Sequence, residues 1–135
     1  MRVFLDANIL FSAALPHSRM RAFLDVVFKE AECVTNAYAA EEARRNLELK
    51  SPGSLRALDS LLKRCKLIPA VVTDLDVPLA SKDLPTLGGA VAGKAAHLLT
   101  GDQQDFGAYF GKTIQGVKVV SPKLLADELV RHGRL

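Results

Sequence analysis

The sequence predicts an α/β domain with a mostly parallel sheet that is covered by helices on both faces. Two observations carry this prediction. Short apolar runs typical of buried strands alternate with longer segments whose apolar residues recur at helical spacing. Such alternation implies that helices connect the strands of one sheet. The 135 residues fit one domain, and a composition of 49% hydrophobic and 24% charged residues is that of a globular protein.

The N-terminal quarter begins with a strand over residues 2–6, where a continuous apolar run ends in Asp6. A short helical segment is expected over residues 9–15, which Pro16 ends. Ser18 is the expected N-cap of an amphipathic helix. The apolar stripe of this helix consists of Met20, Phe23, Leu24, Val27 and Phe28.

The next segment repeats the alternation. Residues 32–35 read as a strand, and Asn36 caps an expected helix over residues 37–50 whose inner face carries small and apolar side chains. Pro52-Gly53 interrupts the chain, and four leucines at helical spacing mark a further helix. These leucines are Leu55, Leu58, Leu61 and Leu62. Residues 67–72 are rich in β-branched side chains and predict a third strand.

The C-terminal half continues with a loop over residues 74–82 and a helix that starts at Asp83, with Pro85 in its first turn. Residues 97–100 predict a strand that ends at Gly101-Asp102, and residues 103–111 predict a turn with one helical turn. A fifth strand is expected over residues 117–120. Ser121-Pro122 then opens the last helix.

The composition limits the function classes. No apolar run reaches the roughly 20 residues of a membrane span, and the chain enters a strand without a signal peptide, so a cytoplasmic protein is expected. Cys33 and Cys65 lie in apolar surroundings and read as reduced core residues. The net charge of +3 and the pI near 9.0 are compatible with a polyanionic partner.

Four acidic residues from distant parts of the chain are expected at one edge of the sheet. Asp6 and Asp102 directly follow strands, Asp83 starts a helix that leads back to a strand, and Glu42 lies in the helix after the second strand. Each aspartate could instead be a helix N-cap, and Glu42 could be a solvated helix residue. If the carboxylates converge, they must either bind a proton or hold a cation.

Oxygen ligands of this kind suit Mg²⁺ or Mn²⁺, and a cation held by carboxylates can polarise a phosphodiester. The competing chemistries have no comparable support in the sequence. It contains no Gly-rich phosphate loop of the P-loop pattern and no Cys/His cluster with zinc spacing.

Four stretches, taken in this order and at this spacing, resemble the PIN-domain ribonucleases, which include the toxins of bacterial and archaeal VapBC toxin–antitoxin pairs. They are VFLDAN at residues 3–8, EEARRNL at 41–47, KDLP at 82–85 and LLTGD at 98–102. The resemblance covers nearly the whole chain and implies a single PIN domain over residues 1–135. The fold that it implies is a three-layer α/β/α sandwich with a parallel five-stranded sheet.

The resemblance also implies a function. The activity would be Mg²⁺- or Mn²⁺-dependent endoribonuclease cleavage of RNA, with a cognate antitoxin as partner and a homodimer as the assembly. The catalytic cluster carried over is Asp6, Glu42, Asp83 and Asp102. Asp6, Asp83 and Asp102 would bind the metal, Asp105 is an optional further ligand, and Glu42 would orient or deprotonate the attacking water.

Several residues around this cluster have two interpretations. Asn8 and Thr100 would support the metal ligands through hydrogen bonds, or merely cap a helix and end a strand. Arg44 and Arg45 would steer phosphate, or lie on a solvated helix face. Ala7 stands where the family usually carries a hydroxyl, which removes one supporting hydrogen bond.

Two other functions compete with the nuclease. A non-catalytic PIN-fold module that binds nucleic acid or protein would be expected to lack some of the four acidic residues. An aspartyl-phosphate phosphatase would use Asp74 or Asp76, which form a D-x-D motif after the expected third strand. The residues that follow, Val77-Pro78, lack the hydroxyl that usually accompanies that motif.

Overall fold

A computed structural model describes residues 1–134 and places them in one six-stranded sheet with helices on both faces. The strand order is β3-β2-β1-β4-β6-β5. In chain order the elements are β1 (Arg2–Leu5), α1 (Ala7–Ala14), α2 (Arg19–Glu30), β2 (Glu32–Thr35), α3 (Ala37–Lys50), the 3₁₀ turn η1 (Pro52–Ser54), α4 (Leu55–Lys63), β3 (Lys66–Leu67), α5 (Leu84–Ala92), β4 (His97–Leu99), α6 (Gln103–Phe106), the 3₁₀ turn η2 (Gly107–Tyr109), β5 (Thr113–Ile114), β6 (Val117–Val120) and α7 (Pro122–Arg131).

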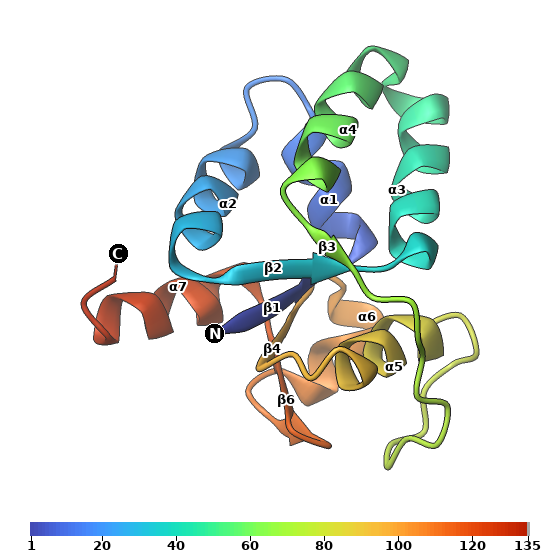
Figure 1. The fold of residues 1–135 in the computed structure, drawn as a ribbon, viewed down its shortest axis with the longest axis vertical. Coiled ribbons are helices and arrows are strands. Elements are labelled where there is room, and N and C mark those ends of the chain that lie inside the picture. Colours follow the sequence, from blue (N-terminus) through green and yellow to red (C-terminus); the bar gives the residue numbers. More distant parts are fainter. Residues whose placement is uncertain (135) are drawn as a thin grey trace.

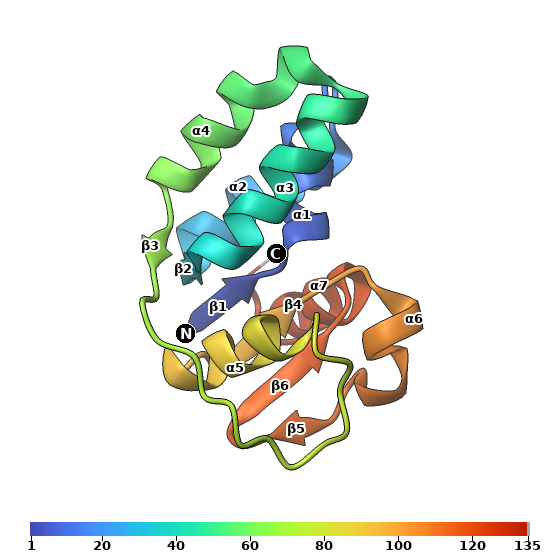
Figure 2. The same cartoon turned by 90° about the vertical axis from the view of Figure 1, so that its right-hand side faces the viewer.

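The helices separate into layers. Figures 1 and 2 show α1 to α4 together on one side of the sheet and α5 on the other. Within the first layer, α1 packs against α2, α3 and α4. The direction of the chain explains this arrangement, because the connections from β1 to β3 run one way along the sheet and the connection from β3 to β4 runs back.

The expected helix starts are confirmed at three caps. The Ser18 hydroxyl accepts the N–H of Arg21, the Asn36 side chain accepts the N–H of Ala39, and Ser121 caps α7. The inner face of α3 is buried as expected. The central strands β1 and β4 are almost entirely inaccessible to water, as expected for parallel strands with both faces covered.

The expected five-stranded parallel sheet needs a correction, because the sheet has a sixth, antiparallel strand. β5 pairs with β6 in a hairpin in which Ile114 faces Val117. The two residues between them, Gln115 and Gly116, both have positive φ, which is the geometry of a tight two-residue hairpin turn. The remaining neighbours in the sheet pair in parallel.

The expected strand over residues 67–72 is wrong beyond its first residues. The N–H of Ile68 still donates to Thr35, but Pro69 has no N–H to continue the ladder. The chain then leaves the sheet, and the N–H of Val72 donates to the carbonyl of Gly88 in α5. A Cβ at Gly88 would lie 2.2 Å from the Val72 carbonyl oxygen, so this close approach requires glycine.

The long coil that follows β3 runs past β5 before it reaches α5 (Figure 2). The Gln115 side chain fastens it, because it accepts the N–H of Asp76 and donates to the carbonyl of Asp74. Within residues 1–134, no helix is both long enough and apolar enough to cross a membrane.

Candidate metal centre

The carboxyl ends of β1 and β4 lie side by side, since Leu5 pairs with Leu99, and this register brings Asp6 next to Thr100. The Thr100 hydroxyl donates to Oδ2 of Asp6 over 2.8 Å and accepts the N–H of Asp102 over 3.1 Å. One buried hydroxyl therefore links the Asp6 carboxylate after β1 to the backbone of Asp102 in the loop after β4.

Asn8 joins the same network from the first turn of α1. Its Nδ2 lies 3.1 Å from Oδ2 of Asp6 and 3.3 Å from Oγ1 of Thr100, and its Oδ1 accepts the N–H of Gly101 over 2.7 Å. The amide therefore holds the start of α1 against the loop after β4. This placement fits the interpretation in which Asn8 and Thr100 support the site.

Asp6 is almost fully buried and also caps α1 through the N–H of Ala7. Burial raises the pKa of Asp6 above its usual value, and the negative charge of Glu42 raises this pKa further. Hydrogen bonds from Thr100, Ala7 and Asn8 lower the pKa in part. Asp6 therefore caps α1 through Oδ1 and joins the network with Thr100 and Asn8 through Oδ2.

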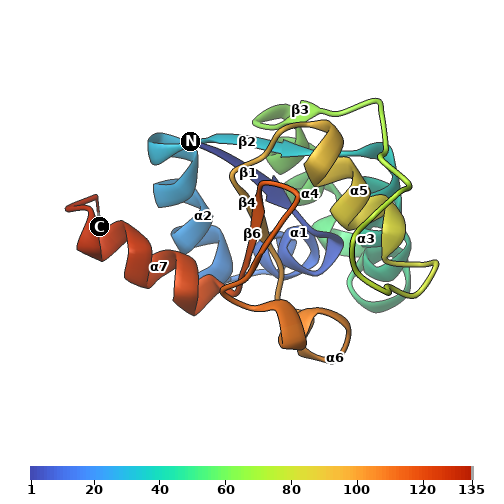
Figure 3. The same ribbon diagram turned by 90° about the horizontal axis from the view of Figure 1, so that it is seen from below.

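A second group of carboxylates lies beside this network. One carboxylate oxygen from each of Asp83, Asp102 and Asp105 lies within 4.8 Å of the other two. Asp83 precedes α5, and Asp102 caps α6 by accepting the N–H of Asp105. Figure 3 shows α6 where it follows β4. Asp105, expected only as an optional ligand, therefore belongs to the group, whereas Asp6 and Glu42 lie outside it.

Asp83 is the buried member of this group, whereas Asp102 and Asp105 are half-buried. It is buried, and its Oδ2 has no hydrogen-bond partner among residues 1–134. Burial, the charge of Asp105 and a hydrogen bond to Asp105 raise the pKa of Asp83 to about 6. Unlike Asp6 and Asp102, Asp83 makes no capping hydrogen bond. A buried carboxylate oxygen in this position needs either a proton or a cation.

The chain places a cation of its own at the rim of the group. Nζ of Lys82 lies 3.1 Å from Oδ2 of Asp105 and lowers the pKa of that carboxyl. The backbone of Lys82 is held in turn by Tyr38, whose hydroxyl donates to the Lys82 carbonyl over 2.9 Å. Sequence reasoning assigned no role to Lys82 or Tyr38, since only the fold brings α3 next to the start of α5.

Asn36 connects the helix that carries Glu42 to the helix that follows Asp83. Its Oδ1 caps α3, and its Nδ2 donates to the carbonyl of Pro85 over 3.0 Å. The sequence predicted the cap but not the second bond. Through this one amide, the first turns of α3 and α5 are fixed relative to each other.

Glu42 lies on the wall of a cavity next to the carboxylates. The cavity has a volume of about 360 Å³ and is lined by Asn8, Phe11, Glu42, Asn46, Lys50 and Asp102. Glu42 is half-buried, whereas its neighbour Glu41 is exposed. This difference favours Glu42 over Glu41 as the functional residue. Glu42 and Asp102 therefore face the same cavity.

The remaining predicted residues lie on α3 and on the coil after β3. Arg44 forms an ion pair with Asp59 of α4 at 2.9 Å, and Arg45 is exposed on α3. Both placements fit a solvated helix face. Asp74 and Asp76 lie exposed on the coil after β3 and do not follow a strand, so the phosphatase alternative loses the placement on which it depended.

The fold and these side chains together define a three-layer α/β/α protein with an acidic site at the carboxyl edge of its sheet. The fold is shared with a chain in the crystal structure of VapBC2 from Rickettsia felis bound to a DNA fragment from their promoter. The TM-score is 0.66 at 19% identity, and the match covers 90% of this chain and 98% of that chain. The three-layer α/β/α fold that the family resemblance implied is therefore confirmed, apart from the additional antiparallel strand β5. No family profile and no curated protein matches the sequence.

Proposed function

We propose that this protein is a metal-dependent endoribonuclease of the PIN type. The observation that carries the proposal is the convergence of Asp83, Asp102 and Asp105, with a buried oxygen of Asp83 that has no partner among residues 1–134. Three carboxylates at this spacing repel one another unless a cation lies between them. Oxygen-only ligands favour Mg²⁺ or Mn²⁺.

The residues present fit such an ion. The ion would be held by Asp83, Asp102 and Asp105. Lys82 would release Asp105 when the ion binds. When bound, the cation supplies Lewis-acid polarisation of a phosphodiester. Asp6 stands one hydrogen-bonded hydroxyl away from Asp102, so it adds negative charge and fixes the loop that carries Asp102. This division of roles replaces the expected one, in which Asp6 was itself a principal ligand.

Glu42 is proposed to orient the attacking water. It faces the cavity that Asp102 also lines, and no hydrogen bond or ion pair to its carboxylate is found among residues 1–134. A free, half-buried carboxylate can accept a proton from water near the scissile phosphate. Asn8 and Thr100 are proposed to position the other groups, since their polar atoms are already engaged with Asp6, Gly101 and Asp102.

We also propose that the protein works as a toxin whose activity an antitoxin restrains, and that it forms a homodimer. The family resemblance and the fold shared with a chain of the VapBC2 complex support this. Co-expression with a small reading frame adjacent to its gene should yield a stable complex. Light scattering of the purified chain measures the assembly.

The nuclease proposal is tested by cleavage of a labelled single-stranded RNA with Mn²⁺ or with EDTA. The wild type should cleave only with Mn²⁺. Asp102→Asn and Asp6→Asn should each lose activity, with melting temperatures close to that of the wild type. Asp127→Asn, which alters an exposed aspartate of α7, is the matched control and should remain active.

Three outcomes contradict the proposal in whole or in part. A wild type that binds Mn²⁺ but leaves every RNA intact would point to the non-catalytic binding module. Full activity of Asp102→Asn would remove the carboxylate group from the reaction. Full activity of Asp6→Asn would remove Asp6 from the mechanism.

A further inference from the structure

We infer that the cavity beside the carboxylates is a nucleobase subsite, in which a base adjacent to the scissile phosphate stacks on Phe11 and hydrogen-bonds to Asn46. The inference rests on the proposed function and names the part of the RNA that the site would recognise. Phe11 projects from α1, and Asn46 projects from α3. Both line the 360 Å³ cavity together with Glu42 and Asp102.

Phe11 supplies an aromatic face that the protein itself does not cover completely. One part of the side chain packs against the hydrophobic core, and the ring is only partly buried. Nζ of the exposed Lys50 lies over the ring, 5.7 Å from its centroid. An ammonium at this distance is held weakly at an exposed site, so a base can displace it. Stacking of a base on an aromatic ring is stronger and tolerates every base.

Asn46 supplies the polar contact. It follows Glu42 by one helical turn and precedes Lys50 by another, so all three side chains lie along one stripe of α3. Among residues 1–134, no hydrogen bond from the Asn46 amide is found, although the amide is half-buried at the cavity wall. A carboxamide offers an NH₂ donor group beside a carbonyl acceptor, which is the pattern that reads the edge of a base such as adenine.

Lys50 completes the subsite with charge. Once a base replaces it over Phe11, its ammonium can reach a flanking phosphate. The cavity volume lies in the range of small-molecule sites, and its wall is shared with Asp102 of the carboxylate group. A nucleotide that placed its base against Phe11 would therefore have its phosphate near the carboxylates. This juxtaposition distinguishes the subsite from an ordinary surface depression.

The test uses single-stranded RNA hexamers that carry 2-aminopurine at one position each. Binding is measured in EDTA and in Ca²⁺, and cleavage is measured in Mn²⁺. The fluorescence of 2-aminopurine should be quenched at one or two neighbouring positions with the wild type. Phe11→Leu should abolish the quenching and raise KM roughly 5- to 100-fold with little change in kcat. Phe11→Tyr, which keeps the ring, should behave like the wild type.

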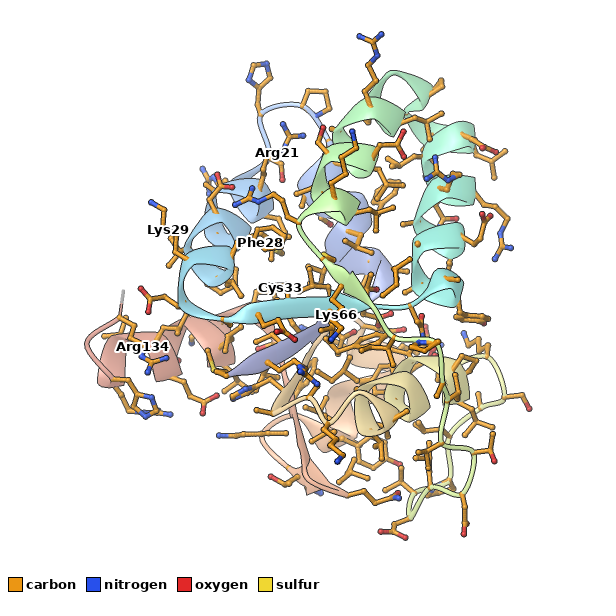
Figure 4. The ribbon with its side chains drawn as sticks, in the orientation of Figure 1. Arg21, Phe28, Lys29, Cys33, Lys66 and Arg134 are labelled. Atoms are coloured by element: carbon orange, nitrogen blue, oxygen red, sulfur yellow. The ribbon has the colours of Figure 1, made fainter. Side chains whose placement is uncertain are left out.

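The matched control is Phe28→Leu. Phe28 also has a cation over its ring, Arg64 at 4.0 Å from the centroid, but it lies on α2 toward α4 (Figure 4). This variant should leave quenching and KM unchanged. Asn46→Leu should keep the quenching but reduce the preference among the four bases at the quenched position.

The outcomes separate the subsite from the proposed function. If the wild type cleaves RNA while Phe11→Leu, folded by its melting curve, keeps wild-type quenching and KM, the subsite is refuted and the nuclease remains. If quenching depends on Phe11 but no RNA is cleaved, the nuclease is refuted and the subsite remains. Equal effects of Phe11→Leu and Phe28→Leu would also refute the subsite, because they would indicate general destabilisation.

Discussion

Nζ of Lys82 lies 3.1 Å from Oδ2 of Asp105, so the third carboxylate of the acidic group is paired with a lysine from the same chain. The lysine side chain is two-thirds exposed, and the aspartate is mostly covered. The positive charge of Lys82 also faces Asp83 and Asp102. Lys82 therefore supplies part of the positive charge that a bound metal ion would supply, and metal binding has to compete with the lysine.

This pairing predicts that Lys82→Met binds Mn²⁺ more tightly than the wild type. Removal of one positive charge leaves Asp105 free to ligate, and the effect should be roughly 2- to 5-fold because the lysine is exposed and screened by salt. Isothermal titration with Mn²⁺ at low ionic strength measures it. Lys123→Met removes an exposed lysine of α7 and should leave the affinity unchanged. Weaker binding by Lys82→Met would mean that the lysine organises the site instead.

Asp83→Asn should stabilise the metal-free protein at neutral pH. The pKa of Asp83 is raised in the folded state to about 6, so the folded protein holds this proton more tightly than the unfolded chain does. The carboxylate therefore costs stability as the pH rises from about 4 to 6, and this cost persists at pH 7. A neutral amide removes it, for a gain on the order of 1–2 kcal/mol.

Urea unfolding at pH 7.5 in EDTA measures this gain. The same experiment at pH 4 should show a smaller difference, because Asp83 is then protonated in the folded wild type. With Mn²⁺ the order should reverse, since binding of an ion stabilises only the form that can ligate it. A loss of stability in EDTA at pH 7.5 would show that the Asp83 charge is already compensated.

The sequence predicted most of the fold because the helix caps and the apolar periodicity are local signals. The starts of α2, α3 and α7 depend on Ser18, Asn36 and Ser121, and each makes the expected bond. Strand β5 was missed because only two residues form it, which is too short for a periodic pattern. Its turn residues, Gln115-Gly116, were the available signal.

The site was predictable only in part for a different reason. The rule that ligands gather at the carboxyl ends of parallel strands brought Asp6, Asp83 and Asp102 to one edge. This rule locates residues only to within several ångströms. It therefore cannot distinguish a metal ligand from a neighbouring residue that lies one hydrogen bond away. Which carboxylates form the closest group depends on side-chain contacts such as Asp102 with Asp105, and these emerge only from the folded chain.

Thr100→Val should weaken both the fold and the metal site. Valine keeps the shape of threonine but cannot donate to Asp6 or accept the N–H of Asp102. Leaving buried polar groups without partners costs about 1–3 kcal/mol. Mn²⁺ affinity should fall as well, because the loop that carries Asp102 loses its anchor. Thr100→Ser restores the hydroxyl and should recover both properties; if Thr100→Val binds Mn²⁺ normally, the hydroxyl does not position Asp102.

At the amino end of β4, opposite the carboxyl edge that carries the site, His97 should make stability depend on pH. Its Nε2 lies 3.0 Å from Oε2 of Glu128, and its buried Nδ1 has no partner among residues 1–134. Burial lowers the pKa of His97 below its ordinary value, although the charge of Glu128 opposes this and Lys118 and the N-terminal amine add to it. The unfolded chain therefore takes up the proton first, and stability should fall as the pH drops below about 6.5.

The measurement is urea unfolding between pH 7.5 and 5 for the wild type, His97→Gln and His132→Gln. Glutamine can still donate to Glu128 but does not titrate, so His97→Gln should show a flatter pH profile. His132 is exposed at the end of α7, and its replacement should leave the wild-type slope unchanged. Since the pKa of Asp83, about 6, lies in the same range, the decisive quantity is the difference between the two variants. Equal slopes would show that His97 accepts its proton in the folded state as readily as in the unfolded chain.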